Sequence, residues 1–230
     1  MNIVNGFKFL NGRDQFDCNV ELSRVRNHFI PFFDHAIEID PFSSVRKRSY
    51  IKLRYNITTG LVSVADNQQY FQTGDANVAD GGKIREFHQT PSEFIDTELF
   101  RVLLKNNKEY LERYSEQSSL EEMTLGIHLI RYDILEGDIS YASPVWLHVD
   151  NEPLVFVHLI DLSLSVIGGD NIIADSNSNP THVVRLENFM DTLILDKSVQ
   201  HAVTPLSSKN GQSKRDVILF TVEDTIQNAS

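Results

Sequence analysis

Short runs of apolar and β-branched residues, separated by turn-forming residues, dominate the second half of the chain. The runs cover residues 124–132, 144–148, 154–162, 171–174, 182–186, 192–195, 199–203 and 215–222. Glycine and asparagine pairs such as Gly168-Gly169 and Asn210-Gly211 stand between them, as in antiparallel strands joined by tight turns. The pattern predicts a mainly β protein with a double-stranded β-helix (jelly roll, cupin-like) core and accessory helices.

The first half has a different pattern. After Pro91, apolar residues recur at spacings of three, four and seven as far as Leu111, which predicts a long amphipathic helix covering one sheet. Residues 49–64 carry strand-like residues around Gly60 and predict an accessory hairpin. The first forty residues follow no single period, and we interpret them as mixed helix and loop.

A length of 230 residues fits one large domain, and neither a repeat nor a long linker interrupts the chain. We expect a single domain over residues 1–230, with accessory helices and strands in 1–123 and the jelly-roll core in 124–223. A hydrophobic content of 41% and a charged content of 23% are ordinary for a globular protein, so the chain has enough apolar residues for its own core.

The formal net charge of -11 argues against a nucleic-acid partner, which requires a cationic surface. The one dense basic run, Arg46-Lys47-Arg48, is either a solvated surface or places Arg48 near a small anionic substrate. A single cysteine, Cys18, allows no internal disulfide. The chain also begins without the apolar run of a signal peptide and contains none long enough to span a membrane. We therefore expect a cytoplasmic protein, whose oligomeric state the sequence leaves open.

Two histidines and an aspartate form the main candidate site. His148 and Asp150 end the predicted strand 144–148, and His201 lies within the predicted strand 199–203. Ligands one residue apart share a strand face, and a neighbouring strand can supply the third. Two imidazoles and one carboxylate suit Fe(II) with open coordination positions. Zinc is the competing metal, but a zinc hydrolase would need a general base, for which Glu152 is the obvious nearby candidate.

Arg215 opens the last predicted strand, which we expect to lie beside the strand of His201. Its planar guanidinium can bind one carboxylate of a dicarboxylate whose other end chelates the metal. 2-Oxoglutarate is such a dicarboxylate, so Arg215 favours iron. The alternative is a solvent-facing arginine, with Lys214 in its place if the register shifts by one residue.

Several segments together resemble bacterial Fe(II)/2-oxoglutarate-dependent hydroxylases of free L-amino acids, of the L-isoleucine 4-dioxygenase kind. They are Tyr70-Phe71-Gln72, Asp80-Gly81-Gly82-Lys83-Ile84-Arg85, Arg131-Tyr132, Ser143-Pro144-Val145-Trp146-Leu147-His148, Gly168-Gly169-Asp170-Asn171, His201-Ala202-Val203-Thr204-Pro205-Leu206 and Arg215-Asp216. The resemblance covers roughly residues 45 to 224 and is most specific between Ser143 and Asn171.

The resemblance implies Fe(II) bound by His148, Asp150 and His201, with Arg215 and Thr204 as candidates for contact with 2-oxoglutarate. It also implies hydroxylation by O2, with 2-oxoglutarate converted to succinate and CO2. A free amino acid requires groups for its carboxylate, its ammonium and its side chain. The candidates are Arg85 and Arg131 for the carboxylate, Glu152 and Asp170 for the ammonium, and Tyr70, Phe71 and Trp146 for an aliphatic side chain.

Three hypotheses follow. The leading one is a hydroxylase of a free aliphatic L-amino acid. The second is a hydroxylase of a peptide or protein side chain, which would need an open groove, whereas residues 70–87 are long enough to close over a small molecule. The third is a non-enzymatic jelly-roll protein whose histidines are structural. The double glycine before Asp170 also allows a purely structural interpretation, as a tight bend.

Overall fold

The computed structural model describes residues 3, 6–43, 45–72, 81–142 and 146–223. In order, its elements are β1 (Phe7–Leu10), the 3-10 turn η1 (Gly12–Gln15), α1 (Asn19–Ala36), β2 (Glu38–Ile39), β3 (Arg46–Asn56), β4 (Val62–Val64), β5 (Tyr70–Phe71), β6 (Ile84–Arg85), the 3-10 turn η2 (Ser92–Asp96), α2 (Glu98–Ser118), β7 (Glu122–Ile134), β8 (Leu154–Leu162), β9 (Val166–Ile167), β10 (Asn171–Ala174), β11 (Pro180–Val184), β12 (Thr192–Asp196), β13 (Gln200–Val203), β14 (Ser207–Ser208) and β15 (Ser213–Glu223).

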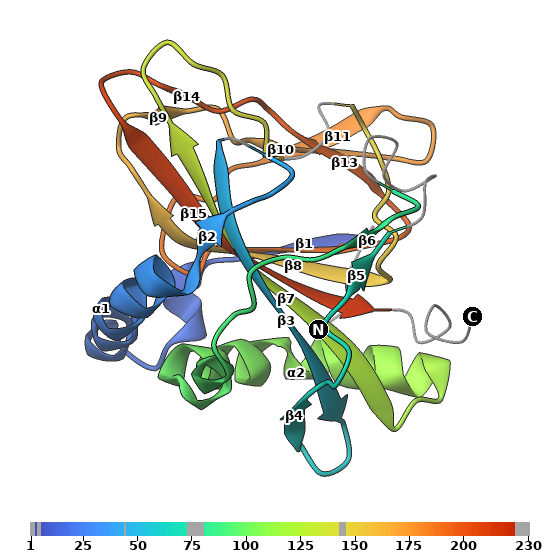
Figure 1. Cartoon of the computed structure of the whole chain (residues 1–230). Helices are drawn as coiled ribbons and strands as arrows, with labels where there is room; N and C mark the ends of the chain where they lie inside the picture. The colour runs from blue at the N-terminus through green and yellow to red at the C-terminus, as the bar shows by residue number, and fades with distance from the viewer. Residues whose placement is uncertain (1–2, 4–5, 44, 73–80, 143–145, 224–230) are drawn as a thin grey trace.

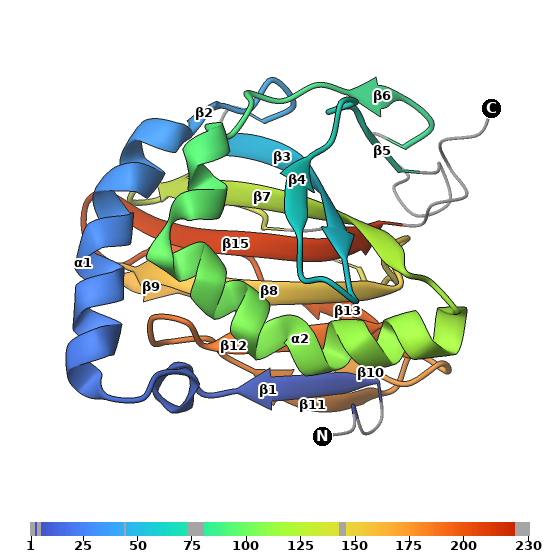
Figure 2. The same ribbon diagram turned by 90° about the horizontal axis from the view of Figure 1, so that it is seen from below.

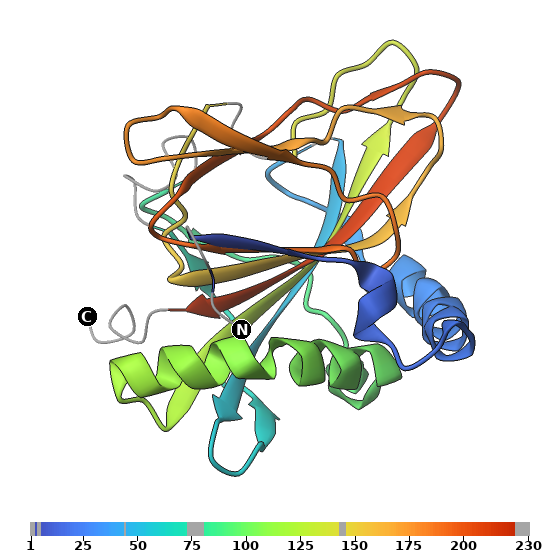
Figure 3. The ribbon, with the colours of Figure 1, turned by 180° about the vertical axis from the view of Figure 1, so that it is seen from behind.

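Two antiparallel sheets form the core (Figure 1). The large sheet has the order β1-β12-β8-β15-β7-β3-β2, with β4 paired to β3, and the small sheet has the order β11-β10-β13. Figure 3 shows the small sheet lying opposite the large one. The pairs β14-β9 and β5-β6 lie outside both sheets. This arrangement confirms the predicted mainly β, jelly-roll class.

The two helices cover the outer face of the large sheet (Figure 2). Helix α2 begins after Thr97, whose hydroxyl accepts a hydrogen bond from the Phe100 amide at 3.1 Å and caps the helix. Its apolar side, including Leu103 and Leu111, is buried against the sheet. The predicted amphipathic helix is confirmed, although the turn after Pro91 is a separate 3-10 element. None of the helices in the described ranges is both long and apolar enough for a membrane crossing.

Alternation along β7 separates two apolar cores. Leu125, Ile127 and Leu129 pack in the cluster under the helices, whereas Ile130 and Tyr132 pack in a second cluster between the sheets. Successive side chains of a strand point to opposite faces, so odd-numbered residues of β7 face the helices and even-numbered ones face the interior. The central strands are buried on both faces, which explains their nearly continuous apolar sequence.

Three expectations need correction. The predicted hairpin forms as β3 and β4, but β3 is not accessory, because it pairs with β7 from Arg46↔Tyr132 to Asn56↔Glu122. The first forty residues contain β1 at the edge of the large sheet and the 18-residue helix α1. The predicted strand 144–148 does not form over its described part, where His148 makes only an isolated bridge. Pro144 and Val145 lie outside the described residues.

Candidate metal centre and ligand cavity

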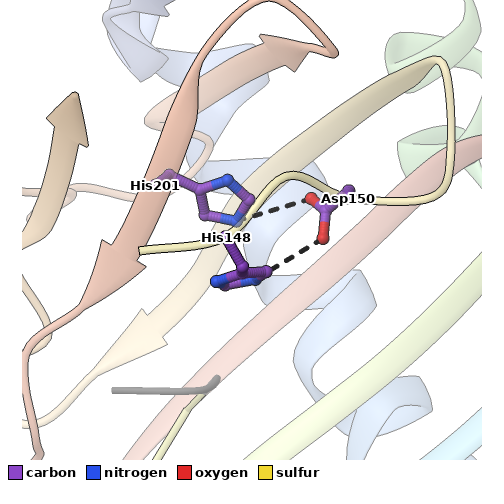
Figure 4. A group of neighbouring side chains, drawn as sticks. All are labelled: His148, Asp150 and His201. Carbon is purple, nitrogen blue, oxygen red and sulfur yellow. Dashed lines mark ion pairs between the residues drawn. The ribbon is translucent and has the colours of Figure 1, made fainter. Parts of the chain in front are cut away.

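His148, Asp150 and His201 converge between the two sheets (Figure 4). One ligand atom from each lies within 4.8 Å of the others. The Asp150 carboxylate lies between the imidazoles, with Oδ1 3.7 Å from Nε2 of His148 and Oδ2 3.4 Å from Nε2 of His201. His201 comes from β13, and its backbone exchanges two hydrogen bonds with that of His148, of 2.8 and 3.0 Å. This bridge holds the loop of His148 and Asp150 beside the small sheet.

The protonation of the imidazoles suits a metal. Nδ1 of His148 lies 3.1 Å from the Trp146 carbonyl, which can only accept, so Nδ1 carries the proton and Nε2 presents its lone pair. Burial, and then the neighbouring His148, lowers the pKa of His201 to about 3, which keeps this imidazole neutral, as a metal ligand must be. Burial raises the pKa of Asp150, and His148 opposes that shift.

The donor set fits Fe(II). Two neutral imidazoles and one carboxylate match the ligand type of non-haem iron oxygenases, and three ligands leave positions for a chelating cosubstrate and O2. Within the described residues these three form the one group of histidine, cysteine and acidic side chains close enough to hold a metal ion.

A cavity of about 320 Å³ adjoins the triad, at the small end of the usual range for ligand sites. Its wall of aliphatic side chains from the two sheets consists of Ile130, Val155, Val157, Leu195, Val203, Val217 and Leu219. Its polar lining consists of Arg46, Arg48, Tyr70, Gln72, Arg85, Tyr132, Tyr141, Asn171 and Arg215, besides the triad. The cavity therefore combines an apolar wall with an unusual number of cations.

Arg215 points into this cavity from β15, which lies between β7 and β8 and not, as expected, beside the strand of His201. It is 4% exposed, and its side chain has no hydrogen bond or ion pair to any residue that the structure describes. Burial lowers its pKa, yet a guanidinium stays charged in proteins. A buried cation without a partner is costly, so the position favours an anionic ligand beside the metal triad.

Three further arginines line the cavity, of which Arg46 pairs with Asp40 and the other two are buried. Arg48 on β3 is 6% exposed and Arg85 on β6 is 4% exposed. Neither forms an ion pair with a carboxylate in the described part of the chain. Arg48 donates to Nδ1 of His128 through Nε at 3.2 Å and Nη2 at 2.8 Å, and Arg85 donates from Nη2 to Oε1 of Gln72.

Glu152 is buried just behind the cavity. Its Oε1 accepts hydrogen bonds from the Tyr70 hydroxyl at 2.8 Å and from Nε2 of Gln72 at 3.4 Å. Burial, together with the charge of Asp150, raises the pKa of Glu152 to about 7. Of the two acids expected to contact an ammonium, Glu152 is therefore the one close to the cavity lining.

Arg131 lies away from the cavity, contrary to expectation. As an odd-numbered residue of β7 it points to the helix face, where its guanidinium pairs with Asp216 and Asp34, both at 2.6 Å. With two carboxylates already bound, Arg131 is a structural link between β15 and α1. Arg131 does lie on a strand, as predicted, but on the face toward the helices and not on the face toward the cavity.

Asp170 and Thr204 bind each other rather than line the cavity. The Thr204 hydroxyl accepts from the Asp170 amide at 2.9 Å and lies 3.3 Å from Oδ2 of that aspartate. Arg185 pairs with Asp170 at 3.1 Å. Gly168 has φ +77°, and a Cβ there would lie 1.8 Å from the Pro205 carbonyl, so the double glycine does form the bend that was the alternative explanation.

Of the three aromatic candidates, two line the cavity and one does not. Tyr70 is buried and lines the cavity, and Trp146 lines it while 51% exposed. Phe71 alternates with Tyr70 on β5, is 39% exposed, and does not line the cavity.

Sequence reasoning missed His128 and left Arg48 undecided. Alternation contained the signal: Ile51, Leu53 and Tyr55 of β3 pack under the helices, so the even-numbered Arg48 must face the interior. The same rule turns His128 of β7 toward Arg48, because Arg48 pairs with Ile130 and Tyr50 with His128.

Comparisons with known proteins agree with this site. The family model described as 2OG-Fe dioxygenase matches residues 32–221. The chain is 32% identical to an L-isoleucine-4-hydroxylase of Bacillus thuringiensis over 188 residues, 81% of this chain and 78% of that protein. It is 35% identical to a 3(1)-hydroxy-L-isoleucine 4-dioxygenase of Pantoea ananatis (strain AJ13355) over 223 residues, 96% of this chain and 87% of that one. A crystal structure of IDO from Bacillus thuringiensis superposes with a TM-score of 0.78 at 26% identity, covering 96% of this chain and 91% of the other.

Proposed function

This chain belongs to the family of 2OG-Fe dioxygenases, and we propose that it hydroxylates the aliphatic side chain of a free, isoleucine-like L-amino acid. The observation that carries the proposal is one small cavity that joins the His148, Asp150 and His201 triad to an apolar wall and to guanidinium groups that pair with no carboxylate among the described residues. The names of two relatives, an L-isoleucine-4-hydroxylase and a 3(1)-hydroxy-L-isoleucine 4-dioxygenase, support the substrate class.

The family uses Fe(II), 2-oxoglutarate and O2. When bound, the metal and its cosubstrate supply the oxidation that inserts one oxygen atom of O2 into a C–H bond, with 2-oxoglutarate converted to succinate and CO2. His148, Asp150 and His201 would hold the iron, and Arg215 would bind the far carboxylate of 2-oxoglutarate through its planar donor fork. The aliphatic wall excludes water and holds the substrate side chain in place.

The polar end of the substrate has two candidate partners. Arg85 offers a buried guanidinium to the α-carboxylate. Glu152, at the Tyr70 hydroxyl, offers a carboxylate to the α-ammonium. The buried Tyr70 and the half-exposed Trp146 would both pack on the amino acid. The expectations for Arg131, Asp170, Thr204 and Phe71 are not retained: the first three bind protein partners outside the cavity, and Phe71 is 39% exposed beside it.

A substrate panel tests the proposal. The protein would be incubated with Fe(II), 2-oxoglutarate and O2 and with each aliphatic L-amino acid, 3(1)-hydroxy-L-isoleucine and an isoleucine-containing peptide. We expect a product one oxygen atom heavier, with matching succinate, from at least one free amino acid. Product from the peptide alone would instead establish the second hypothesis. No heavier product from any of them would refute the proposal.

The metal assignment can be tested without turnover. Mixing the protein anaerobically with Fe(II) and 2-oxoglutarate should give a visible charge-transfer absorption. We expect His201→Ala to abolish this band and His28→Gln, on the exposed face of α1, to retain it. An unchanged band in His201→Ala would contradict the triad.

We also propose that the enzyme acts in the cytoplasm. Its one cysteine, Cys18, is exposed and free, which suits a reducing compartment. Fractionation of the source cells should recover the protein with cytoplasmic markers, and recovery with secreted protein would contradict the assignment.

A further inference from the structure

Arg48 and Arg85 approach the same two aromatic rings. The guanidinium carbon of Arg48 lies 4.0 Å from the ring centre of Phe87 and 5.6 Å from that of Tyr70. That of Arg85 lies 4.8 Å from the Tyr70 centre and 5.8 Å from the Phe87 centre. Two like charges are thus buried close together, and burial followed by nearby Arg46 lowers the pKa of Arg48 to about 10.

Each guanidinium is held by a neutral acceptor. Arginine has only N–H donors, so Nδ1 of His128 must accept from Arg48 with its lone pair. Burial, and then Arg48 itself, lowers the pKa of His128 far below its ordinary value, so this imidazole carries no charge. Arg85 likewise donates to the amide oxygen of Gln72, and its Nε is buried with no hydrogen-bond partner among the described residues.

A neutral acceptor orients an arginine without neutralising it. In the same protein Arg131 shows the contrasting arrangement, with carboxylates on its guanidinium. Because His128 occupies the Nε and Nη2 edge of Arg48, the edge with Nη1 remains for a ligand. Two buried, oriented and uncompensated cations on one cavity require an anionic partner.

The cosubstrate does not meet this requirement. Arg215 lies on β15 and Arg48 on β3, with β7 between these strands, so their backbones are separated by about two strand spacings, or roughly 10 Å. The dicarboxylate has one end for the metal and one for Arg215. The second anion must therefore belong to the substrate.

We infer that Arg48, positioned by His128, and Arg85 together form a clamp for the free α-carboxylate of the substrate. This inference rests on the proposed function and deepens it. A carboxylate between two guanidinium groups makes more than one charge-assisted hydrogen bond, and an uncharged carboxamide cannot replace it. The enzyme would therefore reject amino-acid amides and residues inside a peptide while accepting the free acid.

Binding measurements test the clamp independently of hydroxylation. The protein loaded anaerobically with Fe(II) and 2-oxoglutarate would be titrated calorimetrically with L-isoleucine and with L-isoleucine amide. We expect the wild type to prefer the acid, and Arg48→Gln to weaken binding of the acid by roughly 10- to 100-fold with little change for the amide. Arg54→Gln, on the same strand but exposed and paired with Asp66, is the matched control.

A double-mutant cycle tests the positioning role of His128. We expect His128→Leu to weaken acid binding as Arg48→Gln does, His128→Gln to restore part of it by supplying a neutral acceptor, and the double variant Arg48→Gln/His128→Leu to be no worse than Arg48→Gln alone. The charge-transfer band and the affinity for 2-oxoglutarate should persist in each variant, which shows that the fold and the metal site are intact.

The possible failures are distinguishable. Normal binding of L-isoleucine without hydroxylation of any amino acid would refute the proposed function and leave the clamp standing. Equal affinity of the wild type for acid and amide, no binding of either, or additive effects of Arg48→Gln and His128→Leu would overturn the clamp. So would a loss of 2-oxoglutarate affinity in Arg48→Gln.

Discussion

At the scale of the residue, alternation along a strand decides whether a charged side chain faces the helices or the interior, and so which partners it can bind. Arg131 and Asp216 occupy strand positions facing the helices and form an ion pair there. Arg215, one position before Asp216 on β15, faces the interior and is left without a partner among the described residues. Asp216 and Arg215 are adjacent on β15, yet Asp216 forms a structural ion pair on the helix face and Arg215 faces the ligand cavity.

Arg215→Gln separates a binding role from a structural one. Removing the guanidinium should raise KM for 2-oxoglutarate roughly 10- to 100-fold, the loss of a charge-assisted contact, with little change in KM for the amino acid. Because the unliganded protein gains nothing from an unpaired buried cation, its free energy of unfolding should stay the same or rise. Steady-state kinetics and urea unfolding of the metal-free protein measure both.

The control for this variant is Arg54→Gln, which should change neither quantity. A fall in the free energy of unfolding with KM for 2-oxoglutarate unchanged would show that Arg215 stabilises the fold instead.

The sequence indicated the triad and Arg215 because their residue types are specific for metal and carboxylate binding wherever the fold brings them together. It failed for Arg131 and Asp170, whose structural partners, Asp34 and Arg185 among them, are distant in sequence and invisible to local patterns. For Arg48, the predicted hairpin did not specify which face of its strand points to the interior, so the side chain could not be assigned to the surface or to the cavity.

At the scale of the element, α2 was predictable because its apolar period is long and regular. The described end of the segment 144–148 was not, because an apolar residue that lines a ligand cavity, such as Trp146, looks the same in sequence as one that fills a sheet. What ties α2 to the sheet is also more than apolar packing. His158 on β8 lies between Nδ2 of Asn107 on α2, at 3.3 Å, and the Thr192 hydroxyl on β12, at 2.8 Å.

This link predicts an acid sensitivity. Burial lowers the pKa of His158 from 6.5 to about 3, so the folded protein keeps it neutral while the unfolded chain takes up a proton below about pH 6.5. Stability is therefore complete above that pH and falls as the pH drops from about 6.5 toward 3. Between pH 7.5 and 5.5, one such histidine lowers the free energy of unfolding by about 1.4 kcal/mol.

Urea unfolding at both pH values, in EDTA so that metal binding does not contribute, measures the effect. His158→Gln should be less stable at pH 7.5 but lose about 1.4 kcal/mol less than the wild type on acidification. His28→Gln, exposed on α1, should lose as much as the wild type. Equal losses in His158→Gln and wild type would show that His158 is not held neutral by the fold.

At the scale of the whole molecule, the boundary expected near residue 123 does not separate two packing units. The central strand β7 pairs with β3 on one side and with β15 on the other. The apolar cluster under the helices combines residues of α1, α2 and β3 with Phe156 and Phe220 of the later strands. The sequence predicted the jelly roll correctly, but local patterns could not reveal that an early strand completes its large sheet.

We therefore propose that the chain is one cooperative domain, and that residues 124–223 do not fold alone. Without the first half, β7 and β12 each lose a neighbouring strand, and Phe156 and Phe220 face water on an uncovered sheet. Urea unfolding followed by far-ultraviolet circular dichroism should give one cooperative transition for the full chain, coincident with that of Trp146 fluorescence, and none for residues 124–223. A cooperative transition in the fragment would show that the jelly roll is an independent domain to which the helices and β3 are appended. Restoration of the transition when residues 1–123 are supplied as a second chain would show that the missing contacts, rather than chain truncation itself, prevent folding.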